Sequence, residues 1–185
     1  MSAIFLDRDG VIIRKAPEGE YVGDCSEMEF LPGALDAIAA FCKFGYKVIV
    51  VTNQRGVATG KIQLAKVEEI HTRMRAAISS HGGDLSGIYY CPHDTVEECG
   101  CRKPKPGMLL QAAAEHQLRL PECWMVGDAA TDIAAGKSVG CKTALIEQSE
   151  GFQYCAEAPD ICAESLALAA QRILAAGSGK DRTSR

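Results

Sequence analysis

Two carboxylates follow directly on an apolar run near the N-terminus. Residues 4–6 are apolar and lead into Asp7 and Asp9, and Gly10 then allows the chain to turn. In an extended chain residues i and i+2 point to the same side, so these two carboxylates would share one small volume. A divalent cation, a shared proton or a nearby lysine would relieve their repulsion. A solvated acidic turn after a strand is the alternative, and the Asp-x-Asp spacing alone does not decide between them.

Polar groups also stand at the ends of other apolar runs. These runs are residues 48–51, 88–90 and 124–126, and the polar groups that follow them are Thr52, Asn53, Gln54, Arg55, Arg102, Lys103, Asp128 and Asp132. Taken singly, each would be interpreted as a helix cap, a turn residue or a solvated side chain. Together with the two N-terminal carboxylates they supply what phosphoryl transfer requires. These requirements are a carboxylate nucleophile, oxygen ligands for Mg²⁺, and donors for the phosphoryl oxygens.

The apolar pattern predicts elements that would bring these groups together. Strands are predicted at residues 4–6, 48–51, 88–90, 124–126 and 143–146, and helices at residues 32–45, 64–81, 106–117, 131–138 and 163–176. Such alternation predicts an α/β fold, a Rossmann-like open parallel sheet with helices on both faces. Ligands bind at the carboxyl ends of the strands in such sheets, and every polar cluster falls there. Residues 13–31 are predicted to be irregular.

Length and composition are those of a globular protein with a real core. The chain has 185 residues, of which 47% are hydrophobic and 24% are charged. No repeat, linker or composition shift divides it. We therefore expect a single domain over residues 1–177, followed by a disordered polar tail over residues 178–185.

Charge and targeting signals narrow the class of protein. The net charge of -4 gives no general attraction to nucleic acid or to anionic lipid. No apolar run approaches the roughly 18–20 residues that span a bilayer. Residues 1–3 lack the basic lead of a signal peptide, and the next apolar run ends at Asp7. We expect a cytoplasmic protein with no nucleic-acid or membrane partner, and nothing in the sequence demands more than a monomer.

Four of the residues in and after the third strand have the spacing of metal ligands. The chain has nine cysteines but no secretory signal, so a disulfide framework is not expected. Cys91, His93, Cys99 and Cys101 offer three thiolates and one imidazole within eleven residues, the ligand set of a closed structural zinc site. Unrelated thiols in a flexible loop are the alternative. A zinc ion would fix this polar loop and direct residues 102–103 to the edge of the sheet.

Four motifs along the chain resemble those of the haloacid dehalogenase superfamily of aspartate-dependent phosphotransferases. They are Asp7-Arg8-Asp9-Gly10, Thr52-Asn53, Lys103, and Gly127-Asp128 continuing to Asp132. The resemblance covers nearly the whole chain and implies the fold of that superfamily. Only about 45 residues separate the first two motifs, so no separate cap domain fits. An open site of this kind suits a small substrate, or a loop that acts as a partial lid.

The resemblance also implies roles in catalysis. Asp7 would be the nucleophile, and Asp9 would be the general acid and then the general base. Thr52 and Lys103 would stabilise the phosphoryl group during its transfer.

Magnesium and zinc follow from the same resemblance and from the cysteine spacing. Mg²⁺ would be held by Asp7, Asp128 and the backbone carbonyl of Asp9. Asp132 would lie just outside this ligand set. Zn²⁺ would have a structural role, because all four of its positions would be filled by the protein.

The zinc loop and residues 101–104 after it resemble two related groups of bacterial phosphatases. One group removes the 7-phosphate of D-glycero-D-manno-heptose 1,7-bisphosphate in lipopolysaccharide or S-layer heptose assembly, and the other hydrolyses histidinol phosphate in histidine synthesis. Residues 20–30, 52–61, 87–93 and 105–110 resemble the first group more closely, whereas residues 128–132 are not far from the second. The first group implies a small phosphorylated sugar as substrate, with its anomer left open.

Arg102 is the residue that we expect to bind the second phosphate or the sugar hydroxyls, because a guanidinium grips such groups with a fixed fork. Further expected substrate contacts are Asn53, Gln54, Arg55, Glu18 and Tyr21. For Arg55 a solvated surface role is an equal alternative. The remaining interpretation is a binding module that is held together by zinc and has no catalytic activity. Against it, a protein without catalysis would not need to keep Asp7, Asp9, Lys103 and Asp128.

Overall fold

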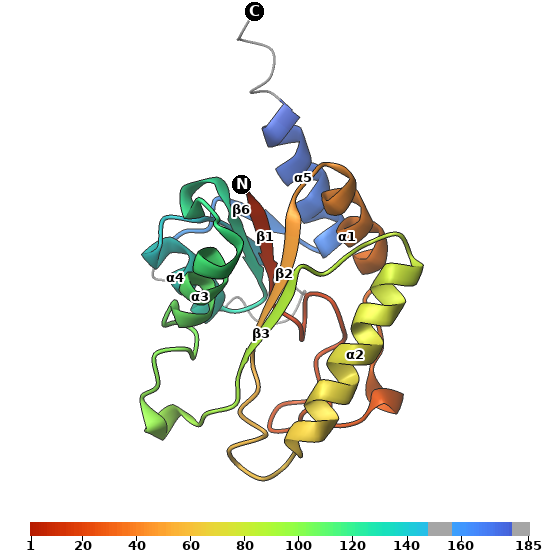
Figure 1. The fold of residues 1–185 in the computed structure, drawn as a ribbon, viewed down its shortest axis with the longest axis vertical. Helices are drawn as coiled ribbons and strands as arrows, with labels where there is room; N and C mark the ends of the chain where they lie inside the picture. Colours follow the sequence, from red (N-terminus) through yellow and green to blue (C-terminus); the bar gives the residue numbers. More distant parts are fainter. Residues whose placement is uncertain (148–156, 179–185) are drawn as a thin grey trace, which may run out of the picture.

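The structure is a computed structural model and describes residues 1–147 and 157–178. In these residues one six-stranded sheet has the order β3-β2-β1-β4-β5-β6, and every neighbouring pair is parallel (Figure 1). The strands are β1 (Ala3–Leu6), β2 (Lys47–Asn53), β3 (Gly87–Cys91), β4 (Trp124–Gly127), β5 (Lys142–Ile146) and β6 (Ile161–Ala163). The predicted open parallel sheet is confirmed.

Helices cover both faces of the sheet (Figure 1). On one face lie α1 (Ala34–Lys43), α2 (Leu64–Ser80) and α5 (Leu166–Ser178), and on the other lie α3 (Gly107–His116) and α4 (Ala130–Ser138). Side chains alternate along a strand, so Ile4 and Leu6 join the first core and Phe5 joins the second. Burial on both faces explains why the strands read as continuous apolar runs.

The C-terminal part of the fold differs from the prediction. A sixth strand, β6, extends the sheet beyond β5, and α5 therefore begins at Leu166 rather than at residue 163. The strand has only three residues, and only Ala163 at its end is buried, so its apolar signal merges with that of the helix that follows. The expected tail lies outside the described residues from residue 179 onward, and Ser178 ends α5.

Residues 13–31 are largely irregular, as predicted. They contain one short 3-10 helix, η1 (Cys25–Glu27), and an isolated bridge joins Ile13 to Phe30. Ile13 and Val22 are buried, so the segment packs against the body of the protein. Two further 3-10 helices are η2 (Thr95–Glu97) and η3 (Leu120–Glu122). Within residues 1–147 and 157–178, no helix combines the length and the apolar character that crossing a membrane requires.

The register of the central strands brings their polar ends together. Leu6 of β1 pairs with Val50 of β2 on one side and with Val126 of β4 on the other. The residues that follow these three strands therefore stand at the same edge of the sheet. Asp7 and Asp128, which are far apart in the sequence, become neighbours for this reason.

Candidate functional site

Three carboxylates meet at the carboxyl edge of the sheet. One oxygen from each of Asp7, Asp128 and Asp132 lies within 4.8 Å of the others. Gly10 has φ of 84°, and a Cβ atom there would lie 2.3 Å from Oδ2 of Asp128. A larger residue at position 10 would be strained and would also push this carboxylate away. The glycine after the two N-terminal aspartates is therefore needed for the approach of β4.

A buried lysine sits between two of these carboxylates. Nζ of Lys103 lies 2.9 Å from Oδ1 of Asp7 and 2.7 Å from Oδ1 of Asp132. It also donates a hydrogen bond of 2.7 Å to the carbonyl of Val51. Burial works to lower the pKa of Lys103, but the charges of Asp132 and Asp7 outweigh it and raise this pKa. Lys103 is therefore a fixed cation beside Asp7.

The side chain of Asn53 holds Lys103 at this place. Its Nδ2 donates to the carbonyl of Lys103, and its Oδ1 accepts from the backbone N–H of Lys103, both at 3.1 Å. Two hydrogen bonds thus join the end of β2 to the loop that carries the lysine. Asn53 was expected to contact substrate, and the structure uses both ends of its amide for this clamp.

Asp9 is held by two side chains. Arg8 is 1% exposed and donates from Nε to Oδ2 and from Nη2 to Oδ1 of Asp9, at 3.1 Å each. Gln54 donates from Nε2 to Oδ2 of Asp9 at 3.0 Å and to the hydroxyl of Thr52 at 2.9 Å. Asp9 and Thr52 are therefore parts of one hydrogen-bonded network.

A cavity of about 330 Å³ opens over this cluster. Of the predicted site residues, its wall contains Asp7, Asp9, Glu18, Tyr21, Thr52, Asn53, Gln54, Arg102, Lys103, Asp128 and Asp132. Arg55 does not belong to this wall. Its exposed guanidinium pairs instead with Asp94, with Nε 2.6 Å from Oδ1. The irregular segment after β1 supplies one side of the cavity, and the loop after the cysteines supplies Arg102 on another.

Sequence reasoning missed two basic residues of the site. Arg8 lies inside the first motif, between Asp7 and Asp9 in the sequence. A cation in that position could have been predicted to bind one of the two carboxylates. Lys15 gave no such signal, and its Nζ lies 2.8 Å from Oδ2 of Asp128. Its position depends on how residues 13–31 fold back over the sheet.

The charges at the sheet edge suit a divalent cation. Burial and the charge of Asp7 raise the pKa of Asp128, against the opposing effect of Lys15. Burial likewise raises the pKa of Asp132, against the effect of Lys103. Burial is the largest cause of both shifts, and the crowding of negative charge by neighbouring carboxylates adds to it. An ion ligated by oxygens of Asp7 and Asp128 would relieve that crowding, so the donor set fits Mg²⁺.

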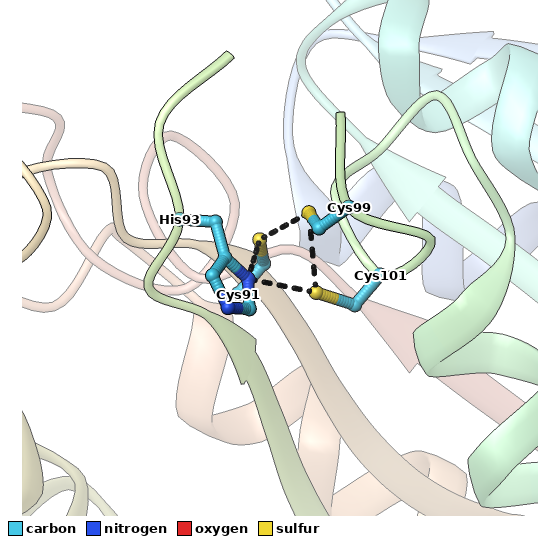
Figure 2. A group of neighbouring side chains, drawn as sticks. All are labelled: Cys91, His93, Cys99 and Cys101. Carbon is cyan, nitrogen blue, oxygen red and sulfur yellow. Dashed lines mark hydrogen bonds between the residues drawn. The ribbon is translucent and has the colours of Figure 1, made fainter. Parts of the chain in front are cut away.

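The four predicted zinc ligands point toward one another (Figure 2). The Sγ atom of Cys91 lies 3.5 Å from Nδ1 of His93 and 3.5 Å from Sγ of Cys99. The Sγ atom of Cys101 lies 3.2 Å from Nδ1 of His93 and 3.4 Å from Sγ of Cys99. In a tetrahedral site, the usual bond lengths to zinc imply distances of about 3.5–3.8 Å between neighbouring ligand atoms. The four side chains therefore fit Zn²⁺ if they move slightly apart.

Comparison with known proteins relates this geometry to a family. A family model described as HAD-hydrolase-like matches residues 100–169. The D-glycero-β-D-manno-heptose-1,7-bisphosphate 7-phosphatase of Pseudomonas putida is 42% identical over 151 residues, which are 82% of this chain and 85% of that protein. The chain belongs to this phosphatase family of haloacid dehalogenase-like hydrolases. The resemblance inferred from the four motifs is thereby confirmed.

Other members of the heptose-bisphosphate phosphatase family agree in sequence and in fold. The protein of the same name from Pseudomonas aeruginosa is 39% identical, over 82% of this chain and 84% of that protein. The crystal structure of D,D-heptose 1,7-bisphosphate phosphatase from B. bronchiseptica, complexed with magnesium and phosphate, superposes with a TM-score of 0.86. Its sequence identity is 33%, and the match covers 95% of this chain and 99% of that chain. Family membership makes this chain a phosphoric monoester hydrolase.

Proposed function

We propose that this protein is a Mg²⁺-dependent phosphatase that removes the 7-phosphate of D-glycero-β-D-manno-heptose 1,7-bisphosphate. The β anomer and the 7-position come from the names of the relatives. The observation that carries the chemistry is the convergence of Asp7, Lys103 and Asp128 at one edge of the sheet, inside the cavity. The proposed setting is heptose nucleotide-sugar synthesis in the cytoplasm.

Asp7 acts as the nucleophile. Its carboxylate attacks the phosphorus of the 7-phosphate, a bond forms between Asp7 and phosphorus, and the bond from phosphorus to the sugar oxygen breaks. Asp9 gives its proton to that leaving oxygen. The ammonium of Lys103 and the hydroxyl of Thr52 face phosphoryl oxygens as charge redistributes.

Hydrolysis of the aspartyl-phosphate completes the cycle. Asp9, which lost its proton in the first step, now takes a proton from water. That water attacks phosphorus, the bond to Asp7 breaks, and inorganic phosphate leaves. Two easier displacements thus replace one of the slowest hydrolyses known.

Magnesium would be held by the carboxylates of Asp7 and Asp128 and by the backbone carbonyl of Asp9. When bound, Mg²⁺ neutralises the carboxylates and the phosphoryl oxygens that approach them. Asp132 is proposed to lie outside this ligand set. What supports this is that its two oxygens face Lys103 and the backbone N–H of Ala129. Its contribution is to hold Lys103.

Arg102 is proposed to bind the second phosphate or the sugar hydroxyls. It lies in the cavity wall next to Cys101, and its Nη1 donates to the carbonyl of His93 at 3.4 Å. A zinc ion on the four ligands of that loop would fix its backbone, and through it Arg102 and Lys103. Glu18 and Tyr21, which belong to residues 13–31, line the same cavity and are proposed to act as a partial lid over an open site.

The test is phosphate release with Mg²⁺ present. The panel contains both anomers of heptose 1,7-bisphosphate, histidinol phosphate and an aryl phosphate. We expect the β anomer of the heptose bisphosphate to give the highest kcat/KM. Preference for histidinol phosphate would keep the chemistry and replace the substrate, and no release from any compound would contradict the proposal and favour a binding module.

A further inference from the structure

A buried histidine that the proposed mechanism does not use lies behind the site. His71 is on α2 and is 6% exposed. It does not belong to the cavity wall. Its Nε2 lies 3.3 Å from Nη1 of the buried Arg8. The imidazole therefore contacts, from the far side, the guanidinium that holds Asp9.

The chemistry of this contact fixes the state of the imidazole. An arginine only donates hydrogen bonds, so Nε2 of His71 is the acceptor and carries no proton. Burial, and then the charges of Arg8 and Arg75, lower the pKa of His71 to about 3. The imidazole is therefore neutral at physiological pH. Its ring also packs against Tyr90, with 5.4 Å between the ring centroids.

Arg8 is constrained on several sides at once. Its Nε and Nη2 hold the two oxygens of Asp9, Nη2 also donates to Oε1 of Gln54, and Nη1 meets His71. A guanidinium is planar and rigid, so a hydrogen bond at one end fixes the direction of the other end. The acceptor on α2 thus helps to set the plane in which Asp9 is held.

We propose that His71 is a positioning residue, which through Arg8 orients the carboxyl group of Asp9 toward the leaving oxygen of the substrate. This inference rests on the proposed function, in which Asp9 is the general acid. His71 itself touches neither substrate nor the reacting atoms. Its effect is on the geometry of proton transfer.

The dependence on the leaving group separates positioning from a general effect on folding. A sugar alkoxide leaves only with a proton from Asp9, whereas an aryl oxide leaves without one. The quantity kcat/KM reports the steps up to the departure of the alcohol. A misplaced Asp9 therefore lowers kcat/KM for a sugar phosphate more than for an aryl phosphate.

The experiment compares His71→Phe, which keeps a ring beside Tyr90 but has no acceptor, with His71→Gln, whose amide oxygen can accept from Arg8. His71→Leu is a second variant without an acceptor, in case the phenylalanine does not fold. Ile70→Val is the matched control, since Ile70 is a buried neighbour on the same helix. Each variant is assayed with the heptose bisphosphate and with p-nitrophenyl phosphate.

We expect His71→Phe and His71→Leu to lower kcat/KM for the sugar phosphate about tenfold. This loss is smaller than the whole contribution of a general acid, because Asp9 is still present but misplaced. The aryl phosphate should lose about twofold or less, with KM nearly unchanged, and His71→Gln should recover most of the loss. Equal losses on both substrates, no loss on either, or a glutamine variant as impaired as the phenylalanine variant would overturn the proposal.

The wild-type protein separates this inference from the proposed function. If it does not hydrolyse the heptose bisphosphate but hydrolyses another alkyl phosphate, the proposed substrate is wrong. The role of His71 is then decided by comparing the loss of kcat/KM for that alkyl phosphate with the loss for p-nitrophenyl phosphate.

Discussion

The carboxylate cluster at the sheet edge and the cysteine loop are both suited to metal ions, but they are assembled differently. Asp7, Lys103 and Asp128 come from segments far apart in the chain and meet only because β1 lies between β2 and β4. The four ligands of the loop lie within eleven residues of the chain, from Cys91 at the end of β3 to Cys101. We expect that loss of Mg²⁺ from the carboxylate cluster would lower the rate of catalysis. Loss of Zn²⁺ from the cysteine loop would lower the stability of the fold.

The largest expected effect is that of Asp7→Asn. Removing the proposed nucleophile should lower kcat at least about a thousandfold, because an amide at position 7 cannot form the covalent intermediate. The folded structure and the zinc content should not change, since Asp7 is not one of the four proposed zinc ligands. Phosphate release, circular dichroism and metal analysis check this, and substantial residual turnover would refute the assignment of the nucleophile.

Cys99→Ser should show the opposite pattern. We expect loss of zinc together with a fall in the unfolding midpoint of about 10 °C, because binding of a structural metal contributes directly to folding free energy. Cys162→Ser is the control, as Cys162 is exposed and belongs to β6. A Cys99→Ser protein that stays active and equally stable without zinc would show that the loop needs no metal.

Asn53 joins the two regions, so its variants measure how far they depend on each other. Asn53→Ala removes both hydrogen bonds to the backbone of Lys103, and we expect kcat to fall about tenfold with zinc retained. Asn53→Asp keeps an acceptor for the N–H of Lys103 but loses the donor to its carbonyl. An intermediate effect is expected, and steady-state kinetics with zinc analysis will show it. Loss of zinc in Asn53→Ala would mean that the two regions are not separable.

The last expected effect appears only in acid and concerns the stability of the protein around His71, behind the carboxylate cluster. The folded-state pKa of His71 is about 3, below the ordinary value of 6.5, so the unfolded chain takes up this proton first as the pH falls. Stability should therefore be lost progressively below about pH 6.5, down to about pH 3. At pH 5 this single group costs about 2 kcal/mol, a cost that His71→Gln removes. Urea unfolding at pH 7.5 and pH 5 measures it, and an identical acid dependence in the glutamine variant would exclude a buried neutral His71.

Sequence alone could predict most of the fold because the apolar runs and their alternation are strong. The five predicted strands and their helices are confirmed, and with them the common edge at which Asp7, Thr52 and Asp128 stand. The short strand β6 was missed, and its last residue, Ala163, was counted in the helix predicted over residues 163–176. The roles of the individual site residues stay predictions.

Side-chain contacts over long separations could not be predicted. The pair formed by Lys15 and Asp128 depends on the path of an irregular segment, and the contact of His71 with Arg8 depends on how α2 is rotated against the sheet. Gln54 was expected to bind substrate, yet its amide is held by Arg8, Asp9 and Thr52. Such contacts follow from tertiary packing, which local patterns do not encode.

A covalent phosphoryl group on Asp7 is the species that the proposed mechanism requires, and it can be sought directly. The wild-type protein is mixed with heptose 1,7-bisphosphate and Mg²⁺, quenched in acid during turnover, digested and mapped by mass spectrometry. We expect a mass increase of one phosphoryl group on the peptide that contains Asp7, and none in Asp7→Asn. Phosphate release without this adduct, together with turnover by Asp7→Asn, would contradict the proposed mechanism.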